Sequence, residues 1–315
     1  MENWQHLGLE VMQNKIYDAS SREISKAMEQ TLPDFKTETI NFRKKGKGYS
    51  EINKKLLEEI LTKELTKNYD KKLLTITGHG TFHHLAYALC QYADKISKRY
   101  SYVHIDKHCD SWRTPEEARL GKLNCANFVP FIMEDTNAQN VLYLGSHIIE
   151  EDPEIFEDNL LMQKYEKSIS LKENVSGFFR EEKLARSIDA LEEDVYISID
   201  LDVMEEYEVI TGYDRGRLTR DGLFDALSRI KNKRRIIGAD IVGYSPFFED
   251  MRKSFEKDPL AKAPGLKFAT NEMLNSNYKL KAKQDAIMYA YFEQIQDLKK
   301  RSFKLYQDIA EFITK

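Results

Sequence analysis

The chain has 315 residues and a formal net charge of −4, from 48 basic and 52 acidic residues that are interspersed along it. This balance gives no positive field that would attract nucleic acid or an acidic membrane surface. No apolar run approaches the ~20 residues of a bilayer-spanning helix, and no signal peptide is visible. Three cysteines without close-pair spacing fit reduced thiols. We therefore expect a cytoplasmic protein without nucleic-acid or membrane partners.

Residues 1–70 are polar, with an extended stretch at Thr37–Phe42 and a helical run from Glu51 to Leu65. Strands and helices alternate after this segment. Helical periodicity is visible at His84–Ile96 and Arg220–Ile230. Apolar runs with two apolar faces predict buried strands at Leu73–Thr77, Tyr102–Ile105, Val141–Leu144, Val195–Ile199 and Arg235–Val242. The alternation predicts an α/β fold, a three-layer α/β/α sandwich with a mainly parallel sheet.

The C-terminal segment, residues 271–315, carries apolar residues spaced alternately four and three, interrupted by Ser302. This stripe predicts a helix that packs on its own domain. An intermolecular coiled coil, which would make a homo-oligomer, is the alternative, although three heptads are few. Because no linker or repeat is visible, we predict one domain over residues 1–315. Residues 1–70 would be an N-terminal extension packed on it, and residues 271–315 a C-terminal helical segment.

Acidic and histidine residues follow three of the predicted strands. Asp106, His108 and Asp110 alternate after the second strand, and Asp200 and Asp202 after the fourth. Histidines at positions 79, 83 and 84 follow the first. If the strand ends stay extended, alternate side chains point to one side. The carboxyl ends of parallel strands also meet at one edge of the sheet, where ligands bind.

Four carboxylates buried together would repel one another unless cations neutralise them. Carboxylate oxygens mixed with imidazole nitrogens suit Mn²⁺, Fe²⁺ or Zn²⁺ better than Ca²⁺. The alternative is that the acids lie on exposed loops or cap helices. Two such strand ends beside a third that carries histidines favour a metal centre.

These motifs resemble those of the arginase–agmatinase–deacetylase superfamily, in its ureohydrolase branch. Gly80–Ala86 is similar to the family's turn with a metal-binding histidine, Asp106–Asp110 matches its Asp-Ala-His-x-Asp motif, and Ser198–Asp202 matches its Ser-x-Asp-x-Asp motif. Gly238–Val242 resembles its late Gly-x-Asp-Ile strand. The resemblance covers roughly residues 73 to 246 and implies an arginase-like fold. It also implies two Mn²⁺ ions per chain, with the ligands His83, Asp106, His108, Asp110, Asp200 and Asp202.

The resemblance implies a reaction as well. A metal-bridging hydroxide, which Asp110 could orient, would attack the guanidinium carbon of the substrate. The family places a histidine in the loop after the second strand, but this chain has Asn127 there. Asparagine can orient a substrate but cannot transfer a proton near neutral pH. His84, His79 or His147 could replace the missing proton donor, unless each is a structural histidine. The catalytic candidates are Asp110, Asn127 and His84.

A second departure concerns the group that grips the guanidinium. Ureohydrolases of this family end the late strand with a glutamate, whereas this chain has Gly243. Tyr244, or acidic residues between Glu205 and Asp214, could take its place. A tyrosine packed in the core and a solvated acidic turn are the alternative interpretations.

A divergent branch of the family has a similar Asn-Phe-x-x-Pro loop and acts on arginine residues within peptides. Intact ligand motifs beside altered substrate motifs therefore favour a peptide arginase. This manganese hydrolase, acting on the C–N bonds of linear amidines, would convert arginine to ornithine in a precursor peptide. The alternatives are a ureohydrolase with a small guanidino substrate (an arginase, agmatinase or guanidino-acid hydrolase), a deacetylase-type amide hydrolase, and a catalytically impaired metal-binding module.

Overall fold

The structure is a computed structural model that describes residues 4–13, 16–18, 37–41, 51–68, 71–146, 169–171, 173, 176–205, 207–211, 213, 215–244 and 279–315. The strands are β1 (Trp4–Gln13), β2 (Ile16–Asp18), β3 (Thr37–Asn41), β4 (Glu51–Asn53), β5 (Lys72–Thr77), β6 (Tyr100–Ile105), β7 (Lys122–Asn124), β8 (Ala138–Leu144), β9 (Ile169–Leu171), β10 (Asp194–Asp200) and β11 (Arg235–Val242). The helices are α2 (Lys54–Leu57), the π-helical η2 (Glu58–Thr62), α3 (Lys63–Asn68), the 3₁₀ helix η3 (Gly80–Leu85), α4 (Ala86–Ala93), α5 (Pro115–Leu120), α6 (Val129–Asp135), α10 (Glu181–Asp189), the 3₁₀ helix η4 (Leu201–Val203), α11 (Arg220–Lys233) and α14 (Lys279–Thr314).

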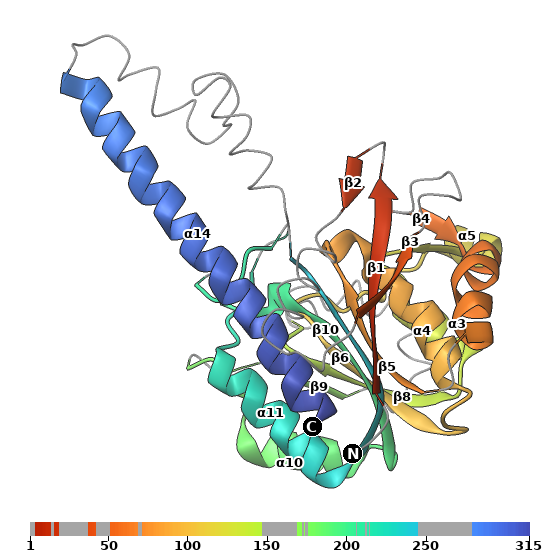
Figure 1. Ribbon diagram of the computed structural model, residues 1–315. Helices are drawn as coiled ribbons and strands as arrows, with labels where there is room; N and C mark the ends of the chain where they lie inside the picture. Colours follow the sequence, from red (N-terminus) through yellow and green to blue (C-terminus); the bar gives the residue numbers. More distant parts are fainter. Residues whose placement is uncertain are drawn as a thin grey trace.

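One large sheet forms the centre of the molecule (Figure 1). Its strands run in the order β2-β1-β5-β11-β10-β6-β8-β9, and β3 also pairs with β1. Only β2 is antiparallel to its neighbour. The five strands predicted from apolar runs are β5, β6, β8, β10 and β11. The prediction of a mainly parallel sheet is therefore confirmed.

The N-terminal region contributes more to the sheet than its polar composition indicates. Strand β1 pairs in parallel with β5, from Trp4 beside Lys72 to Leu9 beside Thr77. The run from Glu51 was predicted to be helical throughout, and this is wrong at its start. Residues Glu51–Asn53 form β4, which pairs with β7. The helix begins only at Lys54, where the Asn53 side chain caps its first turn.

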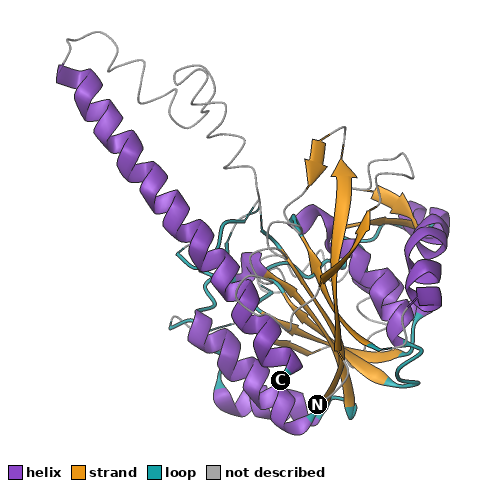
Figure 2. Ribbon diagram, viewed as in Figure 1, coloured by secondary structure: helices purple, strands orange, loops and turns teal. Residues whose placement is uncertain are grey.

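Helices cover both faces of the sheet (Figure 2). One apolar core lies between the sheet and α10, α11 and α14, and it includes Ile197, Ile199 and Ile309. The other lies between the sheet and α2, α3, α4 and α6, and it includes Tyr102, Tyr196 and Leu89. Successive strand residues such as Tyr196 and Ile197 point to opposite cores, which explains why the strand sequences are apolar at every position. The three-layer α/β/α prediction is confirmed.

Helix α14 packs on its own chain at its C-terminal end, as the stripe predicted. Its buried residues face the core beside α11, namely Leu305, Tyr306, Ile309, Ala310 and Ile313. Its side chains before residue 296 lie outside the described residues. No helix in the described part of the chain combines the length and apolar character needed to cross a bilayer.

We expect Ile309→Ala to destabilise the protein by about 2–5 kcal/mol, because it leaves a cavity in a fully buried site. The exposed Lys300→Ala should stay within about 0.5 kcal/mol of wild type. Chemical unfolding measures both values, and size-exclusion chromatography reports the oligomeric state. An unchanged unfolding free energy with a smaller particle would instead indicate that this face packs against another chain.

Strands β5, β11, β10 and β6 are neighbours in that order and run in the same direction. Their carboxyl ends therefore lie along one edge of the sheet. The residues that follow these ends are His79–His84, Gly243, Asp200–Asp202 and Asp106–Asp110. The topology thus brings the predicted site residues to one place.

Candidate metal centre

The acidic residues after β6 converge through a turn. The extended strand end that was the condition for convergence is not present, because β6 ends at Ile105. The Asp106 carboxylate accepts a hydrogen bond from the backbone N–H of His108 at 2.6 Å. Asp200 likewise accepts one from the N–H of Asp202 at 3.0 Å. Such local bonds from backbone to side chain favour turns over extended chain, and both residues of each bonded pair line the same cavity.

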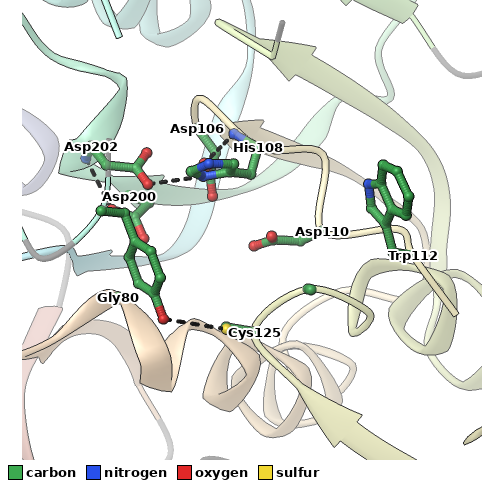
Figure 3. Close-up of a pocket in the computed structure, with 10 residues that line it drawn as sticks. Gly80, Asp106, His108, Asp110, Trp112, Cys125, Asp200 and Asp202 are labelled. Atoms are coloured by element: carbon green, nitrogen blue, oxygen red, sulfur yellow. Dashed lines mark hydrogen bonds and ion pairs between the residues drawn. The ribbon is translucent and has the colours of Figure 1, made fainter. Parts of the chain in front are cut away.

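Asp110 has a φ angle of +48°, and it alone has a positive φ among the non-glycine residues that the structure describes. Aspartate adopts this left-handed conformation more readily than most residues. The conformation is held by the backbone N–H of Val129, which donates to the carbonyl of Asp110 at 3.1 Å. The turn directs the Asp110 carboxylate into the cavity (Figure 3).

His83 has a defined tautomer because of a hydrogen-bond chain behind it. The Ser198 hydroxyl donates to the Asp240 carboxylate at 2.9 Å. The same hydroxyl oxygen must therefore accept from His83 Nε2, which lies 2.8 Å away. This leaves the lone pair of His83 at Nδ1, on the side of the ring that faces away from Ser198. In metal sites, such partners fix the orientation of a ligand histidine.

The lone pair of His83 Nδ1 is surrounded by carboxylate oxygens. Nδ1 lies 3.0 Å from Asp106 Oδ2, 3.1 Å from Asp110 Oδ2 and 3.7 Å from Asp200 Oδ2. His83 is buried, and its Nδ1 atom makes no hydrogen bond. A buried nitrogen lone pair among three carboxylates is repulsive unless a cation lies between them. The residues therefore fit a bound divalent metal ion.

A second group of ligand atoms lies on the other side of Asp106. His108 Nδ1 is 2.9 Å from Asp202 Oδ2 and 3.5 Å from Asp106 Oδ1. Asp106 thus turns Oδ2 toward His83 and Oδ1 toward His108, which is the arrangement of a bridging carboxylate. The two groups of potential ligands share Asp106. Each of the two groups offers at least three donor atoms to a metal ion.

Crowding perturbs these carboxyl groups strongly. Burial, together with the charge of Asp106, raises the pKa of Asp110 to about 7 and that of Asp202 to about 8. Burial and the charges of Asp202 and Asp106 raise the pKa of Asp200 well above its usual range. Burial opposes ionisation of Asp106 too, but the adjacent imidazoles of His108 and His83 outweigh it and lower the pKa of Asp106. Divalent cations would let all four carboxylates ionise together.

His104 lies in the first group of potential ligands, but its ring nitrogens are already committed. Its Nε2–H donates to the carbonyl of His108 at 3.1 Å, and its Nδ1 lies 3.4 Å from the Tyr102 hydroxyl. Burial lowers its pKa to about 3, so the ring is neutral. We therefore regard His104, which lies inside β6, as a buried core residue.

The other catalytic candidates lie behind the cavity wall. His84 is fully buried, and its Nδ1 bonds to the Thr81 carbonyl at 3.2 Å. Asn127 is fully buried too: its Oδ1 accepts from the backbone of Asn124 at 2.8 Å, and its Nδ2 donates to the carbonyl of Lys122 at 3.1 Å. Neither lines the cavity. A catalytic role for either stays a prediction, and for Asn127 it would act through the loop. His147 lies outside the described residues.

Gly243 allows the closest backbone approach to the acidic cluster. Its φ is +115°, and a Cβ atom there would lie 2.4 Å from Asp200 Oδ1. No side chain fits in this conformation, so the glutamate expected from the family has no room here. Tyr244 does not replace it, because it is buried in the core against Phe303. Of the acidic residues considered as substitutes, neither Glu205 nor Glu208 lines the cavity, and Glu206 and Asp214 lie outside the described residues.

A cavity of about 290 Å³ opens above the acidic cluster. Its charged lining residues are Asp106, His108, Asp110, Asp200 and Asp202. The remaining lining residues are uncharged, namely Gly80, Trp112, Cys125, Ala126 and Tyr213. Trp112 and Tyr213 were not predicted from the sequence, where no pattern links them to the metal motifs. Ser198 could have been found, because it lies two residues before Asp200 on the same face of β10.

We expect Ser198→Ala to weaken metal binding by about 10–100-fold, because His83 loses the partner that fixes its tautomer. Isothermal titration calorimetry of the metal-free protein measures this loss. Ser101→Ala is the control: its hydroxyl, also buried in a neighbouring strand, bonds to the backbone of Glu192 away from the site. Equal metal affinity for wild type and Ser198→Ala would contradict the orienting role.

A model of the arginase family matches residues 7–256. A comparison with curated proteins found no match to the chain. Solved structures with a similar fold include the Entamoeba histolytica arginase in complex with L-ornithine, with 14% identity, a TM-score of 0.54 and coverage of 78% of this chain and 92% of that one. Formimidoylglutamase of Bacillus subtilis has 14% identity, a TM-score of 0.53 and coverage of 78% and 80%. Agmatine ureohydrolase of Thermoplasma volcanium has 14% identity, a TM-score of 0.51 and coverage of 98% and 92%. At these identities, the structural likeness shows the fold alone.

Proposed function

Because the chain belongs to the arginase family, we propose that it is a metal-dependent hydrolase that releases urea from the guanidinium group of arginine residues within a peptide. The observation that carries the proposal is the cavity itself. Its charged lining residues all belong to the acidic and histidine cluster. Within the described part of the chain, no further charged group lines it to hold a free α-amino or α-carboxylate group. A peptide-bound arginine has neither of these charges to satisfy.

The proposed metal ligands are the residues of the two groups other than His104, together with Asp200, whose Oδ2 lies 3.7 Å from His83 Nδ1. His83, Asp110 and Asp200 would hold one ion, His108 and Asp202 the other, and Asp106 would bridge them. Asp200 is a second candidate for a bridge, because its Oδ2 lies 3.7 Å from His83 Nδ1 while its Oδ1 accepts the N–H of Asp202. Carboxylate and imidazole donors suit Mn²⁺, and we propose two such ions per chain. When bound, they would lower the pKa of water enough to supply hydroxide near neutral pH.

The reaction adds the oxygen of one water molecule to the guanidinium carbon and breaks the bond from that carbon to the side-chain nitrogen. The protons of water end on the products, which are urea and the ammonium group of an ornithine residue. Asp110 can accept a hydrogen bond from the attacking water, because its carboxylate points into the cavity (Figure 3). Asn127 holds the loop that places Cys125 and Ala126 on the cavity wall.

The test is urea release by the manganese-loaded protein from free arginine, agmatine and peptides that contain arginine. Mass spectrometry of each peptide should show the loss of CN₂H₂ in step with urea. Chelator should stop the reaction, and Asp110→Asn should slow it strongly. Urea from a small molecule alone would support the second candidate, a small-molecule ureohydrolase, which the cluster of ligands also fits. No urea from any of these compounds would reject both functions.

A further inference from the structure

Two exposed aromatic side chains flank the cavity. The described part of the chain exposes three large hydrophobic residues, Trp112 at 38%, Tyr207 at 67% and Tyr213 at 38%. Single exposed apolar residues are common and need no explanation. Here, however, Trp112 and Tyr213 both line the cavity that holds the acidic cluster, whereas Tyr207 does not. Their shared position points to contact with a ligand.

Trp112 is presented by a firmly held loop. Its backbone N–H donates to the carbonyl of Ala126 at 2.8 Å. The next residue, Arg113, is buried and forms two hydrogen bonds with Glu134, at 2.7 and 2.6 Å. The Arg113 guanidinium also lies 4.4 Å from the centre of the Phe131 ring. The backbone that carries the indole is therefore held in place while more than a third of the Trp112 surface stays exposed, which limits the backbone entropy that a ligand must remove.

Tyr213 is held by its hydroxyl group. His79 Nδ1 accepts from the backbone N–H of Thr81 at 3.1 Å, so it also accepts from the Thr81 hydroxyl, 2.7 Å away. The Thr81 oxygen then accepts from the Tyr213 hydroxyl at 2.9 Å. The phenol hydrogen is thus used inside the protein. The Tyr213 ring lies beside the acidic cluster, with its centre 6.1 Å from that of His108.

The two aromatic residues differ in their distance from the cluster. Tyr213 adjoins His108, where the guanidinium and its alkyl stem would lie. Trp112 lies across Asp110 from Asp200 and Asp202, at the far side of the cavity (Figure 3). A ligand that contacts both rings must therefore extend from one side of the cavity to the other. The uncharged lining residue Ala126 lies beside Trp112, because its carbonyl accepts the Trp112 backbone N–H.

From this placement we propose that Trp112 is a specificity-determining residue that binds an apolar side chain next to the reacting arginine in the peptide. The inference rests on the proposed function. Free arginine and agmatine have no group to place against the indole. A peptide with leucine on either side of arginine buries apolar surface there, whereas glycine neighbours do not. Acidic residues next to the arginine in the peptide would approach the carboxylate cluster, so peptides that contain them would be disfavoured.

Kinetics with two capped tripeptides, Leu-Arg-Leu and Gly-Arg-Gly, test this preference in the manganese-loaded protein. We expect Trp112→Ala to lower kcat/KM for the leucine peptide roughly tenfold and to leave the glycine peptide within about twofold. Trp112→Phe should recover part of the loss, and it serves as the test variant if the alanine form does not fold. Tyr207→Ala, at an exposed position away from the cavity, is the matched control and should change neither value. An equal effect on both peptides, or on neither, overturns the proposal.

Peptide binding can be measured without turnover by tryptophan fluorescence. The chain has two tryptophans, Trp4 and Trp112, so replacing Trp4 leaves Trp112 as the reporter. In a Trp4→Phe background, the fluorescence of Trp112 reports the binding of product peptides in which ornithine replaces arginine. We expect a Kd about tenfold lower for the leucine form than for the glycine form. This preference without any urea release would reject the proposed function and retain the binding role of Trp112. Urea release from peptides without a fluorescence change would retain the proposed function and reject the binding role of Trp112.

Discussion

Asp200→Ala is expected to abolish both metal binding and urea release. Asp200 places Oδ2 3.7 Å from His83 Nδ1 and uses Oδ1 to accept the N–H of Asp202. Its loss would remove one ligand of the first metal ion and release the turn that directs Asp202 toward His108. Because loss of a hydrogen-bond partner of a ligand already costs about 10–100-fold in metal affinity or activity, loss of Asp200, a proposed ligand itself, should exceed that range.

The metal content of purified Asp200→Ala, measured by inductively coupled plasma mass spectrometry after loading and gel filtration, checks this expectation. Asp189→Ala is the control, since this exposed carboxylate forms an ion pair with Lys233 far from the cavity. Circular dichroism should show that both variants fold. Two retained metal ions per chain in Asp200→Ala would mean that the ligands are misassigned.

Gly243→Ala is expected to damage stability and metal binding together. The new Cβ would lie 2.4 Å from Asp200 Oδ1 and 2.7 Å from the backbone nitrogen of Leu201. The φ of +115° adds backbone strain of about 1–3 kcal/mol. Overpacking in a closed site costs about 1–3 kcal/mol more. To relieve the clash, β11 would have to move away from β10, and the Asp200 carboxylate would turn from its position beside His83.

Gly121→Ala provides a matched control for the backbone effect. Gly121 also has a positive φ, of +63°, but a Cβ there would meet only the flexible side chain of Lys54 at 3.1 Å. Its cost should stay near the ~1–2 kcal/mol of a left-handed residue, with metal affinity unchanged. Unfolding in urea and calorimetric metal titration separate the two variants. Equal metal affinity in Gly243→Ala and Gly121→Ala would show that Gly243 does not shape the site.

At position 243 the sequence shows which residue is present, and the structure shows why it is glycine. The sequence shows that a glutamate of the family is missing there, and it leaves Tyr244 as a substitute. The structure gives the reason for glycine, a close approach to Asp200, and buries Tyr244 in the core. Asn127 is a similar case. Its substitution for histidine is visible in the sequence, but its use in holding a loop depends on where Lys122 and Asn124 fold back.

The fold and the composition of the acidic cluster could be predicted from the sequence, because both depend on local patterns. Apolar runs with two apolar faces identify strands of a buried parallel sheet, and the chain order places Asp106 and Asp200 after the ends of two of them. Strand β1 escaped prediction, because it lies in a polar region and was recognised only by its pairing with β5.

The sequence by itself thus determined which residues gather in the acidic cluster, since each motif is a run of neighbouring residues. The tertiary structure alone decided how they act. The tautomer of His83 depends on Ser198 and Asp240, and the position of Tyr213 depends on Thr81, in both cases through hydrogen bonds between residues far apart in the chain. The pairing of Trp112 with Tyr213 at one cavity has the same origin. Such contacts follow from packing in three dimensions, and no spacing along the chain encodes them in a form that can be read directly.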